Sequence, residues 1–227
     1  MRRTFDHLAR WYRVLEVLLF RGALERARTE QMDALAQCPR ILLLGEGDGR
    51  FAQELLRRYP SASITIVERS QGMLKRCRQR LGGVSESSQQ YDVQYIEADI
   101  GDWLARPTSV QWDAIVTLFF LDCFEDPELA NIVSELARRL CPKGLWLYAD
   151  FQQTEHGLHR VFTRALIRVL YIFFAVQTDI RARRLVDPRP WLRHHKLSQK
   201  TRCRSLGGLL VSELWQKHDP HQRKGGA

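Results

Sequence analysis

Short apolar runs alternate with amphipathic segments along most of the chain. Apolar positions at helical spacing occupy 49–59 and 71–81, and Asp126-Pro127 opens a third helix that Pro142 and Gly144 close, since proline is tolerated in a first turn. Such alternation predicts βαβ units and a mostly parallel sheet. Five runs have the length and composition of buried strands: 41–44, 64–68, 93–97, 113–118 and 144–150.

The two ends of the chain carry different patterns. Residues 5–20 form an amphipathic helical pattern whose charges interrupt the apolar positions, so this stretch is predicted to be neither a signal peptide nor a membrane span. Near the other end, 200–206 and 209–215 flank Gly207-Gly208, which predicts an antiparallel hairpin at the sheet edge. We therefore expect one α/β domain built on a Rossmann-like, doubly wound, seven-stranded sheet, mostly parallel with an antiparallel C-terminal hairpin.

Composition supports this picture and narrows the chemistry. The 227 residues are 44% hydrophobic, which is enough to fill the core of a single domain. The five cysteines are scattered and lack C-x-x-C spacing, so they indicate neither a disulfide framework nor a zinc site. Reduced thiols and a cytoplasmic location are expected, with no metal.

The positive charge is concentrated in the C-terminal third. Residues 157–227 hold 15 Lys and Arg against 4 Asp and Glu, whereas residues 1–156 hold 20 against 22. A basic surface can bind nucleic acid, anionic lipid or an acidic small molecule, and composition does not choose among these partners. A solvated face without a partner fits the composition equally well.

A glycine loop, GEGDG at 45–49, directly follows the first apolar run. Closely spaced glycines let a ligand approach the backbone, but the two carboxylates would repel a phosphate. The dinucleotide fingerprint G-x-G-x-x-G fails because position 50 is Arg, and the Walker sequence Gly-Lys-Ser/Thr is absent. The ligand predicted for this loop is therefore not a nucleotide phosphate. A tight turn without any ligand is the alternative.

Five stretches in order resemble the class I S-adenosylmethionine-dependent methyltransferases, over about residues 38–217. They read ILLLGEGDGRF, ITIVERS, IEADI, DAIVTLFFLDCF and LCPKGLWLYADF. The opening FDHLARWYRVLEVLLFRG looks like the leading helix of the ubiquinone/menaquinone methyltransferase branch. The resemblance implies an N-terminal helical lid (1–37), a cofactor-binding core (38–151), a helical acceptor-side insert (152–198) and the C-terminal hairpin (199–217).

The resemblance also implies the residues around S-adenosylmethionine, which carries a sulfonium, an amino group and a ribose diol but no phosphate. Glu68, at the end of the second strand, would accept hydrogen bonds from both ribose hydroxyls, and Glu46 or Asp48 would lie near the ammonium. Asp99 would hold the adenine amino group, with the next backbone N–H on a ring nitrogen. The expected cofactor-binding residues are Tyr12, Gly45, Glu46, Gly47, Asp48, Gly49, Glu68, Arg69, Met73, Asp99, Ile100, Thr117 and Leu118.

Structural alternatives stand beside several of these roles. Glu68 could be a surface carboxylate paired with Arg69 or Lys75, and Met73 a core methionine instead of a flank for adenine. Asp99 precedes Gly101-Asp102-Trp103 and would serve equally as a helix cap.

The loop after the fourth strand predicts the type of acceptor. It reads LFFLDCFED, without the Asn/Asp-Pro-Pro-aromatic sequence typical of nucleobase amino-methyltransferases. Asp122 in this loop and His156 after the fifth strand are candidate catalytic bases. Asp122 could instead cap the next helix, and His156, like the nearby His159, could face solvent.

An apolar helical pattern at 161–176, with arginines on one stripe, suggests a hydrophobic aromatic, quinone-like or lipid acceptor. Its arginines and the basic C-terminal third would suit peripheral contact with an anionic membrane. An ordinary core helix is the structural alternative. Two other functions stay open: an RNA or DNA methyltransferase that uses the basic third, and a non-catalytic cofactor-binding module.

Overall fold

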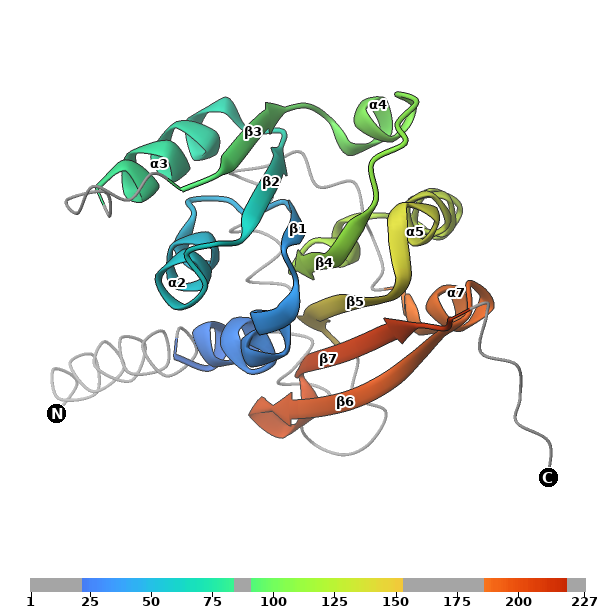
Figure 1. The fold of residues 1–227 in the computed structure, drawn as a ribbon. Coiled ribbons are helices and arrows are strands. Elements are labelled where there is room, and N and C mark those ends of the chain that lie inside the picture. The colour runs from blue at the N-terminus through green and yellow to red at the C-terminus, as the bar shows by residue number, and fades with distance from the viewer. Residues whose placement is uncertain (1–21, 84–90, 153–185, 220–227) are drawn as a thin grey trace, which may run out of the picture.

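The computed structural model describes residues 22–83, 91–152 and 186–219. Its centre is a twisted sheet whose strands follow the expected apolar runs, with helices on both sides (Figure 1). The seven strands are β1 (Arg40–Leu44), β2 (Ser63–Glu68), β3 (Val93–Glu97), β4 (Trp112–Leu118), β5 (Leu140–Phe151), β6 (Leu197–Ser205) and β7 (Leu210–Lys217).

The strand order is β3-β2-β1-β4-β5-β7-β6. Strands β1 to β5 are parallel, and β7 pairs antiparallel with both β5 and β6. The order reverses between β1 and β4, and in a doubly wound sheet ligands bind at the carboxyl ends of strands beside such a reversal. The sequence-predicted fold class, including the seven strands and the C-terminal hairpin, is confirmed. The hairpin begins at Leu197, two residues before its expected start.

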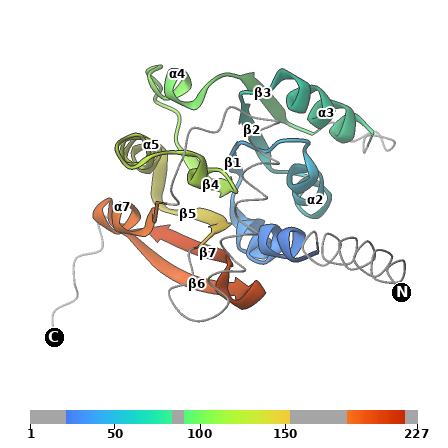
Figure 2. The ribbon, with the colours of Figure 1, turned by 180° about the vertical axis from the view of Figure 1, so that it is seen from behind.

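Two layers of helices bury the two faces of the sheet (Figures 1 and 2). One hydrophobic cluster joins this sheet to η1 (Met32–Gln37), α2 (Arg50–Arg58) and α3 (Gln71–Gly82). The other joins it to α4 (Ile100–Leu104), α5 (Asp126–Arg139) and α7 (Arg189–His194). The central strands are buried on both faces, which is why their sequences are continuous apolar runs without alternation.

The third predicted helix ends earlier than its sequence suggests. α5 ends at Arg139 and β5 begins at Leu140, so Pro142 and Gly144 lie in the first part of a strand. Trp112 of β4 pairs with Leu140, and a register shift then brings Ala114 opposite Leu145. The pairing of β4 with β5, which joins residues distant in the sequence, therefore ends α5 before the Pro142 and Gly144 positions at which the sequence predicted its end.

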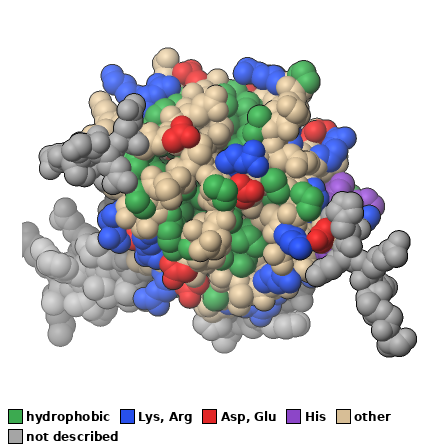
Figure 3. Space-filling model, in the orientation of Figure 1, with side chains coloured by type: hydrophobic (Ala, Val, Ile, Leu, Met, Phe, Trp, Pro, Cys, Tyr) green, Lys and Arg blue, Asp and Glu red, His purple; other side chains and the backbone are tan. Residues whose placement is uncertain are grey.

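The face shown in Figure 3 carries acidic and basic side chains interspersed, and the histidine side chains in view gather at one edge of it. His194 and His195, at the end of α7, stack edge to face with ring centroids 5.1 Å apart. Among the described residues, no helix has the length and apolar content needed to cross a membrane.

Candidate functional site

The glycine loop makes a tight turn between β1 and α2. Gly45, Gly47 and Gly49 have φ angles of +64°, +69° and +84°, a region that residues with a Cβ rarely adopt. A Cβ on Gly45 would lie 2.4 Å from the ring of Phe120, and one on Gly49 would lie 2.7 Å from Cys77 Sγ. Two of the glycines therefore also permit close packing against the β4 loop and α3.

Glu68, the last residue of β2, reaches across to this loop. Its carboxylate accepts the backbone N–H of Gly47 at 3.1 Å through Oε2 and that of Ser70 at 2.8 Å through Oε1. Each oxygen has a second lone pair, so both can still accept a ligand hydroxyl. The structure thus brings Glu68 and Gly47 together at the sheet edge, as the sequence predicted. The ribose role of Glu68 stays a prediction.

Glu46 turns back toward the start of α2. Its carboxylate accepts the Ala52 N–H at 2.9 Å, which supplies the side-chain acceptor that Gly49, as N-cap, lacks. Burial raises the pKa of Glu46 to about 7, although this hydrogen bond and the charge of Arg28 lower it. Glu46 therefore has a structural partner within the protein, and proximity to a cofactor ammonium stays a prediction.

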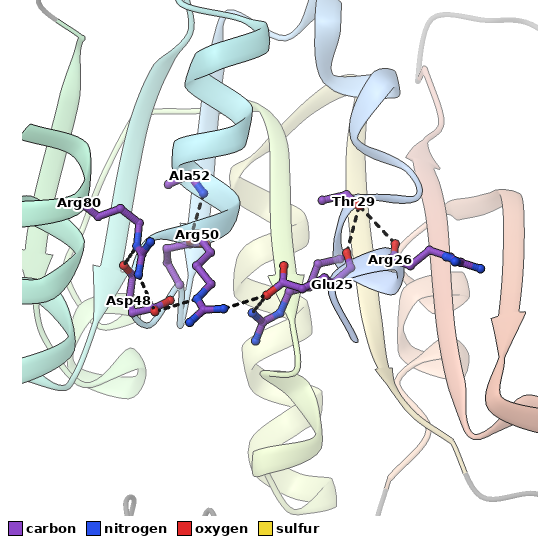
Figure 4. Close-up of polar contacts among 9 residues, drawn as sticks. Glu25, Arg26, Thr29, Asp48, Arg50, Ala52 and Arg80 are labelled. Atoms are coloured by element: carbon purple, nitrogen blue, oxygen red, sulfur yellow. Dashed lines mark hydrogen bonds and ion pairs between the residues drawn. The ribbon is translucent and has the colours of Figure 1, made fainter. Parts of the chain in front are cut away.

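Asp48 belongs to a chain of alternating charges that crosses the loop (Figure 4). Its Oδ2 lies 3.0 Å from Arg80 Nη2 on α3 and 2.9 Å from Arg50 Nε, and Arg50 in turn lies 3.5 Å from Glu25. Burial raises the pKa of Asp48, but the two arginines outweigh it and hold that pKa below its ordinary value. The chain ties the loop to α3 and to the helical segment 22–29.

The residues expected to surround adenine lie where β2 and β3 end. Asp99 caps α4, because its Oδ1 accepts the Gly101 N–H at 2.9 Å, so the alternative noted from the sequence is present. Its Oδ2 lies 4.0 Å from Arg69 Nη1. Ile100 is buried and Met73 is half-buried, one turn into α3. The cap uses one carboxylate oxygen of Asp99, and the adenine role stays a prediction.

The end of β4 lies beside the glycine loop. The Thr117 hydroxyl accepts the Trp146 indole N–H at 2.9 Å and is fully buried, so a ligand could meet this residue through its backbone. After Leu118, Phe119 adopts a positive φ of 54° and the chain enters η2 (Leu121–Cys123). α5 has Glu125 at its N-cap position, so Asp122 does not cap that helix.

Two functional candidates became visible only in the structure. Arg28, from the helical segment 22–29, lines a pocket beneath the loop, and its guanidinium lies 5.4 Å from the ring centroid of Phe119. Asp150, near the end of β5, is 1% exposed and accepts the Asp122 N–H at 3.1 Å. The sequence could have identified Asp150, because it is a carboxylate at the end of a predicted strand. No sequence feature distinguishes Arg28 from the other arginines. The pocket is lined by Arg28, Leu43, Leu44, Gly45, Glu46, Phe51, Val116 and Leu118.

Tyr12 and His156 lie outside the described residues, as does the apolar segment 161–176. Within 22–83, 91–152 and 186–219, no group of three or more His, Cys, Asp or Glu side chains could hold a metal ion.

Residues 41–144 match the protein family described as a methyltransferase domain. This part of the chain is a methyltransferase domain. The match extends from the first residues of β1 into β5, so it includes the glycine loop, Glu68, Asp99 and the loop after β4. It leaves out the N-terminal helical segment and the C-terminal hairpin.

Two of the curated relatives each match more than half of this chain. A malonyl-[acyl-carrier protein] O-methyltransferase of Paenibacillus sp. is 29% identical over 125 residues, covering 55% of this chain and 43% of that protein. A trans-aconitate 2-methyltransferase of Methylobacterium nodulans is 31% identical over 137 residues, covering 58% of this chain and 48% of that protein. The matched part of this chain thus spans less than half the length of these relatives.

Solved structures share the fold at low sequence identity. N-methyltransferase NodS from Bradyrhizobium japonicum, in complex with S-adenosyl-l-homocysteine, has a TM-score of 0.59 at 17% identity, over 86% of this chain and 87% of that one. A Burkholderia thailandensis 1,6-didemethyltoxoflavin-N1-methyltransferase, with 1,6-didemethyltoxoflavin and S-adenosylhomocysteine bound, has a TM-score of 0.61 at 14% identity, over 94% of this chain and 86% of that one.

Glu46 should make stability depend on pH. Its folded pKa of about 7 exceeds its ordinary value of 4.5, so between these pH values the folded state binds the extra proton and the free energy of unfolding falls as pH rises. Glu46→Gln keeps an oxygen for the Ala52 N–H but does not titrate. As pH rises from 4.5 to 7, we expect the free energy of unfolding of this variant to increase by about 1 to 3 kcal/mol relative to that of the wild type, after allowance for the partial exposure of Glu46.

Chemical denaturation at several pH values measures this difference. Glu128→Gln, an exposed change at the start of α5, is the control, and its curve should run nearly parallel to that of the wild type. If the curve for Glu46→Gln also ran parallel to that of the wild type, Glu46 would not have a raised pKa in the folded protein.

Proposed function

We propose that this protein transfers a methyl group from S-adenosylmethionine to a small-molecule acceptor. The observation that carries the proposal is the methyltransferase-domain match over 41–144, whose glycine loop and Glu68 meet at the sheet edge beside the strand-order reversal. S-Adenosylmethionine supplies an electrophilic methyl group, so the protein must orient the acceptor, exclude water and, for some acceptors, accept a proton.

The described residues have the groups that such a ligand needs. Glu68 offers carboxylate oxygens to a ribose diol, and Asp99 keeps one oxygen free of its cap. Arg28, beside Gly45 and Glu46, is a cation within reach of the loop and suits the carboxylate of a bound amino acid moiety. The glycine loop presents no phosphate-binding charge, in keeping with a ligand that has no phosphate.

For the acceptor, we propose a hydrophobic aromatic, quinone-like or lipid molecule. Support comes from the apolar sequence 161–176, which follows β5 along the chain. The ubiquinone/menaquinone branch is the corresponding finer family assignment. Contact with an anionic membrane surface, weakened by salt, belongs to the same proposal.

A second acceptor class has its own support. The curated relatives are named for malonyl-[acyl-carrier protein] and trans-aconitate, both acids. A basic C-terminal third, with 15 Lys and Arg against 4 Asp and Glu, would attract an acidic acceptor. Nucleic-acid methylation is less favoured, because the loop after β4 lacks the Asn/Asp-Pro-Pro-aromatic sequence typical of nucleobase amino-methyltransferases, and these relatives are named for other molecules. A non-catalytic module would bind the cofactor without turnover.

The test supplies the enzyme and methyl-labelled S-adenosylmethionine with three separate fractions: lipid extract, polar metabolites and total RNA. Label in lipid supports the hydrophobic acceptor, and label in acidic metabolites supports the second class. Label confined to RNA would overturn both. If calorimetry shows that S-adenosylmethionine binds but no fraction becomes labelled, the result would support a non-catalytic cofactor-binding module. Absence of binding heat with S-adenosylmethionine and S-adenosylhomocysteine would overturn the proposal as a whole.

A further inference from the structure

Strand β6 lies at the outer edge of the sheet, because among the described strands it pairs with β7 alone (Figure 1). The stretch 188–212, which contains α7 and β6, holds six Lys and Arg residues and no Asp or Glu. Two of these cations, Arg189 and Arg202, pair with Glu213 of β7, which is 0% exposed. Glu213 is thus neutralised inside the protein, and it does not compensate the exposed cations along β6.

Three of the remaining cations lie along this edge. Lys196 directly precedes β6, Lys200 lies at the irregularity in its pairing with β7, and Arg204 lies near its end. All three residues are exposed, and none forms an ion pair with another described residue. By contrast, Arg57 and Arg58 on the surface of α2 both pair with Glu54. The β6 edge is therefore a row of uncompensated positive charge, roughly 25 Å long.

The helix α3 also exposes cations, which are Lys75, Arg76 and Arg78. Acids are exposed beside them, because Arg78 packs over Tyr95 of β3 and that strand exposes Glu97. The nearest exposed acid found for β6 is on its other face. Glu30 precedes Gln31, whose amide lies 3.3 Å from Cys203 Sγ, and successive side chains of a strand point to opposite faces, so Arg204 points away from it.

The turn between β6 and β7 adds an apolar side chain to this edge. Leu206 is 42% exposed and Val110 is 48% exposed, and no other large hydrophobic side chain in the described part of the chain is exposed. Leu206 follows Arg204 by two residues. Cations beside an apolar group are the combination that binds the boundary between anionic lipid headgroups and acyl chains.

The aromatic residues argue against nucleic acid as the partner. Proteins that hold single strands combine cations with exposed aromatic rings, because bases stack on these rings. Trp191 is the one Trp, Tyr or Phe residue in 188–212. It is half-buried and donates its indole N–H to Asp126 Oδ1 at 3.3 Å. A lipid surface therefore fits this edge better than RNA or DNA does.

We propose that the β6 edge, consisting of Lys196, Lys200, Arg204 and Leu206, is the surface with which this protein contacts an anionic lipid membrane. The inference rests on the membrane contact included in the proposed function, but not on methyl transfer itself. Ser205 pairs with Leu210, which pairs with Phe151, so the turn that carries Leu206 lies at the sheet edge where β5 ends. Contact at this edge would bring a lipophilic acceptor to the side of the sheet that carries the glycine loop.

Sedimentation with vesicles measures the contact without cofactor. The wild type should bind vesicles of phosphatidylcholine and phosphatidylglycerol, bind phosphatidylcholine alone much more weakly, and lose affinity as salt rises. A triple variant, Lys196→Asn with Lys200→Gln and Arg204→Gln, should bind the anionic vesicles about 30- to 100-fold more weakly, since each cation contributes about 5-fold. Asparagine is used at 196 because it tolerates the φ of +62° found there.

A second triple variant on α3 is the matched control, with Lys75, Arg76 and Arg78 each changed to Gln. It removes the same charge from another surface and should keep the affinity within about 3-fold. Leu206→Asn should weaken binding by about 3- to 10-fold, whereas Val110→Thr should leave it unchanged. Urea denaturation verifies that each variant is folded.

Equal losses in the two triple variants would show that net charge, and not the β6 edge, drives binding, and would overturn the inference. Failure of the wild type to bind anionic vesicles would also overturn it. Binding to single-stranded RNA that the β6 variant abolishes, with vesicle binding unchanged, would assign the edge to nucleic acid instead. Absence of binding heat with S-adenosylmethionine would overturn the proposed function and leave the vesicle result unaffected.

Discussion

Gly49→Ala is expected to lower the free energy of unfolding by about 2 to 5 kcal/mol. Gly49 has a φ of +84°, so alanine would strain the backbone. Its Cβ would also lie 2.7 Å from Cys77 Sγ and 3.0 Å from Cys77 Cα, and the latter is helix backbone that cannot move aside cheaply. Backbone strain and overpacking both raise the free energy of the folded state, so their costs add.

The neighbouring Gly47 provides a matched control. Its φ of +69° imposes a similar backbone strain, but a Cβ there would meet nothing within 4 Å. Gly47→Ala should therefore cost only about 1 to 2 kcal/mol. Urea denaturation with a constant m-value measures both variants, and removal of Sγ by Cys77→Ala should recover part of the loss in Gly49→Ala. Equal losses in Gly47→Ala and Gly49→Ala would show that the α3 contact is unimportant.

Glu68→Ala should weaken the binding of S-adenosylmethionine by about 10- to 100-fold, or roughly 1.4 to 2.8 kcal/mol. The change removes the acceptor predicted for the ribose diol. It also frees the N–H groups of Gly47 and Ser70, which Glu68 now holds at 3.1 and 2.8 Å, so the loop loses order before the ligand arrives. Isothermal titration of the folded variant gives the affinity directly.

Glu97 is the matched control for this measurement, because it lies opposite Glu68 at the end of the adjacent strand β3 and is exposed. Glu97→Ala should leave the affinity within about 2-fold. Glu68→Gln, which keeps one acceptor oxygen, should lie between the wild type and Glu68→Ala. Wild-type affinity in Glu68→Ala would remove Glu68 from the cofactor site.

Local sequence was sufficient for the framework. Apolar runs of strand length, helical spacing after the glycine loop and Gly207-Gly208 each act over a few neighbouring residues, so strands, helices and the hairpin could be predicted. The parallel arrangement followed because alternating strands and helices pack as βαβ units. The same reasoning brought Gly47 and Glu68 to one edge, since the carboxyl ends of parallel strands meet there.

Side-chain partners depended on the tertiary structure. Glu46 and Asp48 were both expected near a ligand, yet one hydrogen-bonds to the start of α2 and the other pairs with Arg80, 32 residues away. Sequence identifies a carboxylate but does not give the direction of its side chain, which depends on the N–H groups and cations that packing brings near.

The loop after β4 shows the same limit of local information. Asp122 was selected from its position, but its contact with Asp150 joins residues 28 apart across two strands. The β4–β5 register and burial of the β5 end create that contact, and these depend on the whole sheet. Sequence by itself determined the fold, the glycine loop and the strand-end acid, because these rest on local patterns. The tertiary structure alone decided which acids cap a helix and which pair with arginine, because those contacts depend on distances between remote residues.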